Sequence, residues 1–186
     1  AGGRAEGILG TLLSREVSRT DLVISSAAGV DPTLPLGRRV DCSRRHLIAS
    51  LDNTLSVLGT DYLDLWSVGF WDGKTPPEEV ADTLDYAVRT GRVRYTGVRG
   101  YSGWQLAVTH AAANHAAASA RPIVAAQNEY NLLVRRAEEE LLPGRGFFRG
   151  RSPRSGGTHR EIPVAYSFSL ARGKRTSQRG GTGLLG

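Results

Sequence analysis

The strongest constraint on the fold is a regular alternation of short apolar runs and helical stretches across residues 1–143. The apolar runs are brief and rich in β-branched residues, as expected for strands buried on both faces. We expect strands at 22–26, 61–70, 93–99 and 122–130, and helices at 5–13, 44–59, 75–91, 102–118 and 134–142. Such alternation with short connections indicates parallel βα units. The pattern leaves two architectures open, an open doubly wound sheet and a (β/α) barrel.

Two of the predicted helices carry clear start signals. Ser43 is expected to cap the helix that follows it, where leucines recur at helical spacing until Gly59. Thr75 is expected to cap the next helix, because two prolines and two acidic residues come directly after it. Pro143 is expected to close the last short helix.

The charge of the chain is concentrated in its C-terminal segment, residues 144–186. That segment holds nine Lys or Arg, one acid and ten glycines, while the rest of the chain is slightly acidic. We therefore divide the chain into a βα domain, 1–143, and a basic Gly/Arg-rich tail, 144–186, of low order. We interpret the tail as a divergent end or the out-of-frame product of a GC-rich gene. Nucleic-acid binding rests on the tail charge alone and is the weakest hypothesis.

Several strings occur together in one order: GRAEGILG, RTDLVISS, LGTDYLDLW, GRVRYTGV, YSGWQL and QNEYNLL. In this order the chain resembles the aldo-keto reductase superfamily, especially its bacterial and potassium-channel-β-subunit-like branch. The resemblance covers roughly residues 2–143 and implies the second through sixth helices of the family fold. It therefore favours a partial (β/α)8 TIM barrel of four to five βα units, since a full barrel needs about 250 residues.

The family resemblance also implies a chemistry, NADPH-dependent reduction of aldehydes and ketones by a Tyr, Lys, His and Asp tetrad. The Tyr is a general acid assisted by the neighbouring Lys, and the His orients the carbonyl. Ala27 stands at the Lys position and Gly69 at the His position. The Tyr and Asp positions would precede GRAEGILG. The resemblance thus implies a catalytically degenerate member, a pseudoenzyme, and we leave open whether the chain is an enzyme.

The cofactor implied by the resemblance is NADP, and four residues correspond to its contacts. Arg99 and Gly100 replace the Ser-Asn pair that holds the nicotinamide carboxamide, and Gln127 matches the second carboxamide ligand. Tyr166 is a candidate for the aromatic ring that stacks on nicotinamide. A strand-end Gln can also simply satisfy backbone groups, which is the structural alternative for Gln127.

Two aromatic residues, Trp71 and Tyr101, follow strands at the rim where barrel active sites lie, so we expect them to line a substrate pocket or to pack under a loop. Asp72 is expected to serve a turn rather than acid catalysis. The four histidines lack metal-ligand spacing, so no metal site is expected. Cys42 is expected to be an inert thiol.

Two functions stay open at this stage. The first is a carbonyl reductase acting on a small carbonyl substrate, and the second is a non-catalytic regulatory or binding protein of the same fold. An incomplete barrel leaves open strand edges, so we expect self-association or a protein partner that closes it. No apolar run is long enough for a membrane helix, and the single cysteine fits a reducing compartment, so we expect a cytoplasmic protein without a membrane contact.

Overall fold

The computed structural model describes residues 4–13, 17–31, 34–35, 39–116, 123–130 and 132–144, together with the backbone of 164–167. Its strands are β1 (Ser25–Ala28), β2 (Leu63–Gly69), β3 (Val93–Arg99), β4 (Ala125–Glu129) and β5 (Val164–Ser167). Its α-helices are α1 (Arg4–Leu13), α2 (Arg44–Leu58), α3 (Pro77–Arg89), α4 (Gly103–Ala116) and α5 (Leu141–Gly144). Two 3-10 turns, η1 (Arg19–Asp21) and η3 (Arg136–Glu138), complete the described elements.

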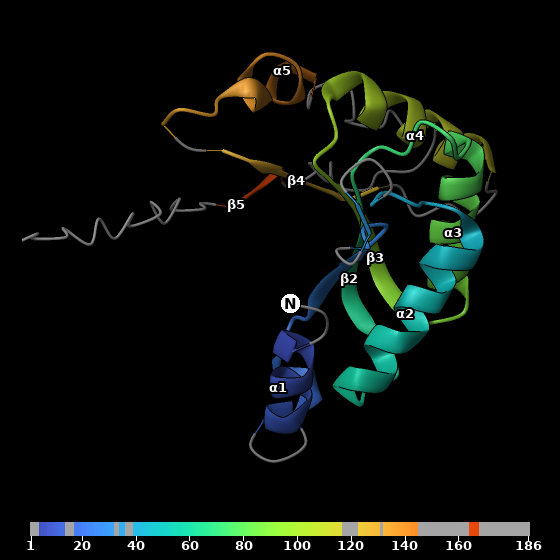
Figure 1. Ribbon diagram of the computed structural model, residues 1–186, viewed down its shortest axis with the longest axis vertical. Helices are drawn as coiled ribbons and strands as arrows, with labels where there is room; N and C mark the ends of the chain where they lie inside the picture. Colours follow the sequence, from blue (N-terminus) through green and yellow to red (C-terminus); the bar gives the residue numbers. More distant parts are fainter. Residues whose placement is uncertain are drawn as a thin grey trace, which may run out of the picture.

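The five strands form one parallel sheet in the order β1-β2-β3-β4-β5. Each strand lies beside the one that precedes it in the chain, so the order never reverses. A doubly wound sheet reverses its strand order at a switch point, whereas a (β/α)8 barrel adds each strand on the same side. The topology therefore confirms the partial barrel and excludes the doubly wound alternative for these strands. Figure 1 shows α2, α3 and α4 following one another along one face of the curved sheet.

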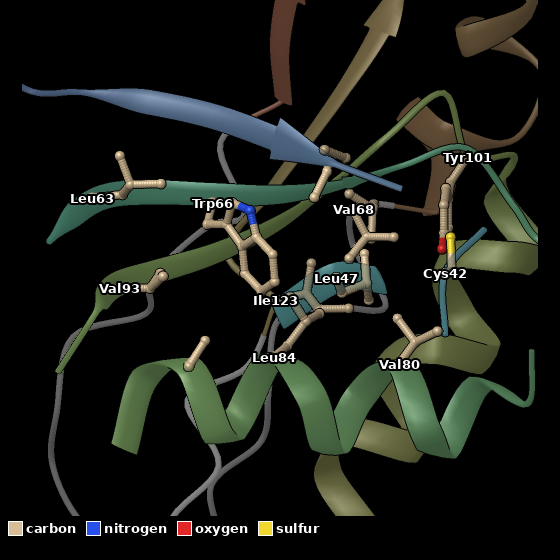
Figure 2. Close-up of a cluster of buried hydrophobic side chains, with 14 of the residues drawn as sticks. Cys42, Leu47, Leu63, Trp66, Val68, Val80, Leu84, Val93, Tyr101 and Ile123 are labelled. Atoms are coloured by element: carbon tan, nitrogen blue, oxygen red, sulfur yellow. The ribbon is translucent and has the colours of Figure 1, made fainter. Parts of the chain in front are cut away.

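The core lies between the sheet and these helices. Alternate strand residues such as Val68, Val98 and Ala126 are buried there with Leu47 and Leu84 of the helices. Figure 2 shows Trp66 and Val68 of β2 directed toward α3 and Leu47. Burial of each large apolar side chain contributes about 1.5–3 kcal/mol. Hydrophobic packing on this side thus fixes which face of each strand is left for a site.

Helix α2 confirms the signals expected at both of its ends. The Ser43 hydroxyl accepts a hydrogen bond from the His46 N–H at 3.4 Å, and Gly59 adopts φ +66° at the C-terminus. Leu47, Leu51 and Leu58 are buried along one side of the helix. Glu6 of α1 accepts hydrogen bonds from Ser26 and Thr54, which ties α1 to β1 and α2.

The expected start of α3 is wrong in one detail. The residue that caps α3 is Pro76, and it makes no side-chain capping bond. Thr75 does not cap the helix, because its hydroxyl donates to Asp72 Oδ2 at 2.7 Å. Proline is tolerated in the first turn of a helix because the backbone N–H groups there have no intrahelical acceptor.

The first expected strand, 22–26, is shifted toward the C-terminus. Regular pairing begins at Ser25, and Val23 is largely exposed. The backbone N–H of Ile24 donates to the Asp64 carboxylate rather than to a strand partner, at 2.8 Å. The side chain of Asp64 therefore occupies the place where the sheet ladder would have continued.

The single helix expected at 134–142 is also wrong. The chain forms η3 and the one-turn helix α5 instead, and Pro143 lies inside α5 rather than after it. Glu140 precedes α5, and its carboxylate accepts a hydrogen bond from the Gly103 N–H at the start of α4. This tertiary contact outweighs the weak helical preference of so short a segment.

Within the basic tail, residues 164–167 form β5, which pairs with β4. The remainder of 145–186 lies outside the described residues, so the division of the chain at residue 143 stays a prediction. The prediction that a second subunit or a partner closes the barrel also stays a prediction.

Candidate functional site

The carboxyl ends of the strands bring the predicted site residues into two adjacent rows. One row runs from Ala27 through Ser67 and Gly97 to Ala125. The next row toward the strand ends contains Gly69, Arg99, Gln127 and Ala165. Since side chains alternate along a strand, both rows lie on the face opposite the buried core positions. We call this face of the sheet, lined by the residues of these two rows, the inner face.

Ala27 and Gly69, which the resemblance places at the family's Lys and His positions, lie near the carboxyl ends of neighbouring strands. A Cβ atom at Gly69 would lie 3.3 Å from the Ala28 carbonyl oxygen and 3.5 Å from Val30. A larger residue would need a shift of a few tenths of an ångström at this position. The tight contact gives a local reason for glycine, and neither residue contributes a polar side chain to the inner face.

Arg99 and Gly100 were expected at the family's carboxamide-binding pair, and their surroundings differ from what that pair requires. Gly100 has φ +68°, and a Cβ atom there would lie 2.7 Å from the ring of Phe70. Phe70 itself has φ +64°, an unusual value for an aromatic residue, and its N–H donates to the Arg99 carbonyl at 2.7 Å. The Phe70 ring thus occupies the space beside position 100, so an Asn side chain there would require the ring to move.

Gln127 occupies its place in the row with its side-chain amide unengaged by any described residue. Its carbonyl oxygen accepts a hydrogen bond from the Gly100 N–H at 2.8 Å, which extends the ladder beyond β3. The available Gln127 amide is compatible with a role in binding the nicotinamide carboxamide. Arg99 and Gly100, at the other two positions of that contact, are not. As a set, the described residues do not fit the nicotinamide contact that the resemblance implies.

Tyr166 lies on β5 and pairs with Asn128 of β4 in the register. Its side chain lies outside the described part of the structure, so a stacking role stays a prediction. Asn128 donates from Nδ2 to the Tyr101 carbonyl at 2.7 Å and thereby holds the loop after β3 against β4.

Trp71 and Tyr101, the residues expected at a substrate pocket, differ in exposure. Trp71 is partly buried and contacts Tyr101 and Trp104 edge to face, with ring centroids 5.7 and 5.1 Å apart. Tyr101 is only 1% exposed and belongs to the core cluster. Tyr101 therefore has almost no exposed surface with which to contact a substrate in this structure. Trp104, which the sequence analysis did not single out, is the most exposed ring of the three.

Cys42 and Asp72 form a buried polar cluster beneath this aromatic group. Asp72 Oδ2 accepts from the Cys42 N–H at 3.0 Å and from the Thr75 hydroxyl at 2.7 Å, and Oδ1 accepts from the Lys74 N–H at 3.0 Å. Figure 2 shows the Tyr101 side chain directed toward the Cys42 sulfur. The expectation that Asp72 serves a turn is confirmed, because it joins the loop before α2 to the loop after β2.

The titration of these groups follows from their burial and contacts. Burial, together with the nearby charges of Asp72 and Asp41, raises the pKa of Cys42 to about 12. Burial raises the pKa of Tyr101 as well, with the Cys42 and Asp72 charges adding to the effect. Burial alone would raise the pKa of Asp72, but the hydrogen bonds from Cys42, Thr75 and Lys74 outweigh it and hold that pKa below its usual value. Near neutral pH, Cys42 and Tyr101 are therefore neutral and Asp72 is ionised.

From the sequence, Ala27, Gly69, Arg99 and Gln127 were named individually, but Phe70, Ser67 and Trp104 were not singled out. No local signal marks Phe70, because its left-handed backbone and its contact with Gly100 arise from the approach of two separate loops. Ser67 could have been found by counting alternate residues along its strand. Among the described residues, no cluster of His, Cys, Asp and Glu side chains is arranged to hold a metal ion. Nor does that part of the chain contain a helix that meets the length and hydropathy needed to span a bilayer.

Comparison with known proteins agrees with the strand order. A model of the aldo/keto reductase family matches residues 2–144. L-glyceraldehyde 3-phosphate reductase of Escherichia coli (strain K12) is 38% identical over 102 residues, which cover 54% of this chain and 29% of that protein. Versiconal hemiacetal acetate reductase of Aspergillus parasiticus is 30% identical over 159 residues, which cover 76% of this chain and 45% of that protein.

A third relative, 6-dehydroglucose reductase of Novosphingobium aromaticivorans, is 35% identical over 106 residues, covering 56% of this chain and 34% of that protein. The chain thus spans less than half the length of these curated relatives. The matched region ends with α5, before the basic tail.

Proposed function

Because the chain belongs to the aldo/keto reductase family, we propose that it is a ligand-binding member of that family that does not reduce carbonyl compounds. One observation carries the proposal. Ala27 on β1 and Gly69 on β2 stand where the resemblance places the family's Lys and His, and their side chains offer neither an ammonium group nor a hydrogen-bond donor. General acid catalysis contributes about 10²–10⁴-fold to a rate, and it needs a positioned proton donor.

Neighbouring groups do not replace the lost side chains. Cys42 holds its proton because its pKa is raised to about 12, and it is fully buried. Asp72 is ionised, and both of its oxygens accept hydrogen bonds from the loops around it. Tyr101 is a phenol, as the family's acid is, but it lies in the core and its pKa is raised, whereas the acid needs a lowered pKa.

The second candidate function is NADPH-dependent reduction of an aldehyde or ketone. It is favoured by the family match and by the names of the relatives, which are reductases. In this candidate Gln127 would hold the nicotinamide carboxamide. The cofactor would supply a hydride, while the described residues would only bind and orient it.

The deciding experiment measures turnover and binding separately. The chain is incubated with NADPH and a reactive aromatic aldehyde, and NADPH absorbance is followed against a protein-free control. We expect no loss of absorbance above that control. Turnover proportional to protein concentration would overturn the proposal and support the second candidate.

A matched variant distinguishes turnover at this site from a contaminating reductase. Gln127→Leu removes the one available amide of the inner face without removing a hydrogen bond to a described residue. Turnover that arises at this site should fall in the Gln127→Leu variant, whereas a contaminant would leave the rate unchanged.

A further inference from the structure

Arg99 places a positive charge at the carboxyl end of β3, on the inner face. Its residue is exposed, and no salt bridge joins it to a described acid. Glu129 follows Gln127 on the same face of β4, but it has an interaction of its own and does not pair with Arg99. The N–H donors of the Arg99 guanidinium thus have no acceptor among the described residues.

Two further polar side chains lie beside this charge. Gln127 is the direct partner of Arg99 in the strand register, and no hydrogen bond to its amide is found in the described part of the chain. Ser67 lies one row below and is only 4% exposed, yet its hydroxyl makes no hydrogen bond with a described residue. That hydroxyl lies over Gly97, where a Cβ atom would come within 2.8 Å of it. The Ser67 oxygen does not belong to the fully buried, unpaired side-chain atoms of the described residues, so it keeps some exposed surface.

The row that contains Ser67 carries little side-chain bulk below Arg99. Its other members, Ala27, Gly97 and Ala125, have small side chains or none. The row beneath pairs Leu65 with Tyr95, and the Tyr95 residue is 42% exposed. Rows on one face of a strand are separated by about 6.6 Å. A ligand with its charged end at Arg99 would therefore cross the small row and meet an apolar surface.

We propose that Arg99 and Gln127 bind the carboxylate of a small, apolar monocarboxylic acid whose body lies over Ser67 and Gly97. The guanidinium pairs with both carboxylate oxygens, and the Gln127 amide donates a further hydrogen bond. This inference rests on the proposed function, because it names the ligand class of the same inner-face site. An acid is favoured over a neutral amide because the Ser-Asn pair is replaced by a cation and a glycine that the Phe70 ring closes off.

The test uses benzoate as the probe, benzamide as its neutral counterpart, and inorganic phosphate as a second anion. Binding to the full chain is measured by isothermal titration calorimetry at low salt. We expect saturable benzoate binding that weakens as salt is added, with benzamide and phosphate binding at least about 10-fold more weakly, since charged hydrogen bonds contribute about 1.5–3 kcal/mol.

Three variants complete the test. Arg99→Ala should weaken benzoate binding about 10- to 100-fold, and Gln127→Leu should weaken it less. Arg45→Ala removes an exposed charge from α2 and should leave binding unchanged. Neither Arg99 nor Gln127 has a side-chain partner among the described residues, so all three variants should keep the urea midpoint of the parent chain.

The outcomes separate this inference from the function that it rests on. Equal binding of benzamide and benzoate, equal binding of phosphate, no benzoate binding, or equal effects of Arg99→Ala and Arg45→Ala would each overturn the carboxylate site. Aldehyde turnover is a different readout, and it overturns the proposed function whatever the calorimetry shows.

Discussion

Asp72 offers the sharpest test of how the rim of the sheet is held together. Its carboxylate accepts three hydrogen bonds: the one from the Cys42 N–H joins the segment before α2 to the loop that follows β2, and the two from Lys74 and Thr75 lie within that loop. The substitution Asp72→Ala removes both acceptor oxygens, and with them all three hydrogen bonds, and leaves the backbone in place. We expect the loops that carry Cys42 and Trp71 to separate and the free energy of unfolding to fall.

The size of the effect follows from the exposure of the three donors. The Cys42 N–H belongs to a residue with no exposed surface, so losing its acceptor leaves a buried unpaired donor, which costs about 1–3 kcal/mol. Lys74 and Thr75 are more exposed, so water replaces part of what they lose and each costs about 0.5 kcal/mol. We therefore expect a total loss of about 2–4 kcal/mol, a large fraction of the 5–15 kcal/mol that is typical of a domain.

Urea unfolding followed by tryptophan fluorescence measures this loss, because Trp71 adjoins the substituted residue. Asp82→Ala, which removes an exposed carboxylate from α3, is the matched control and should change stability by less than about 0.5 kcal/mol. A loss below about 1 kcal/mol for Asp72→Ala, or an equal loss for the control, would refute the argument that the buried donor dominates.

The pH dependence has a defined sign. Because hydrogen bonds hold the pKa of Asp72 below its unfolded value of about 3.9, the carboxylate contributes stability above that value. The contribution is lost as the pH falls through the folded-state pKa. The stability difference between parent and Asp72→Ala should therefore stay constant from pH 5 to 7 and shrink below about pH 4. A difference that is independent of pH down to pH 3 would show that the charge of Asp72 does not matter.

Two further predictions concern the fold. Gly100→Ala should lower the free energy of unfolding by more than Gly59→Ala, because both add a Cβ to a left-handed residue at about 1–2 kcal/mol, but only the first meets the Phe70 ring at 2.7 Å. Urea midpoints compare the two variants, and equal losses would mean that the ring moves aside freely. Leu51→Ala should lower the free energy of unfolding by about 2–5 kcal/mol, since this fully buried side chain packs in the core; a loss below about 1 kcal/mol would contradict that packing.

Most of the barrel segment could be predicted from local sequence, and the failures have identifiable causes. The helix after Ser43 was predicted correctly because its cap, its leucine spacing and Gly59 are local signals. The strand near Ile24 was misplaced because the side chain of Asp64, distant in sequence, binds the backbone there. Near Pro143, the Glu140 side chain instead accepts a hydrogen bond from the backbone of Gly103, at the start of α4. Such contacts form only when the fold brings the segments together.

The candidate site, like the fold, was predicted from the sequence only in part. The resemblance identified Ala27 and Gly69 as substitutions, and no coordinates were needed for that. Whether another group could replace the missing Lys and His was visible only in the structure. The Cys42 thiol and Tyr101 lie in the core, and burial raises their pKa values.

The alternation of apolar and helical segments thus determined the parallel βα architecture by itself, because period and length are properties of neighbouring residues. The direction in which strands are added, and therefore the barrel, was visible only in the sheet order. The row that aligns Gly69, Arg99 and Gln127 was likewise decided by tertiary structure. Register depends on hydrogen bonds between strands that lie some thirty residues apart, and a local sequence pattern does not encode it.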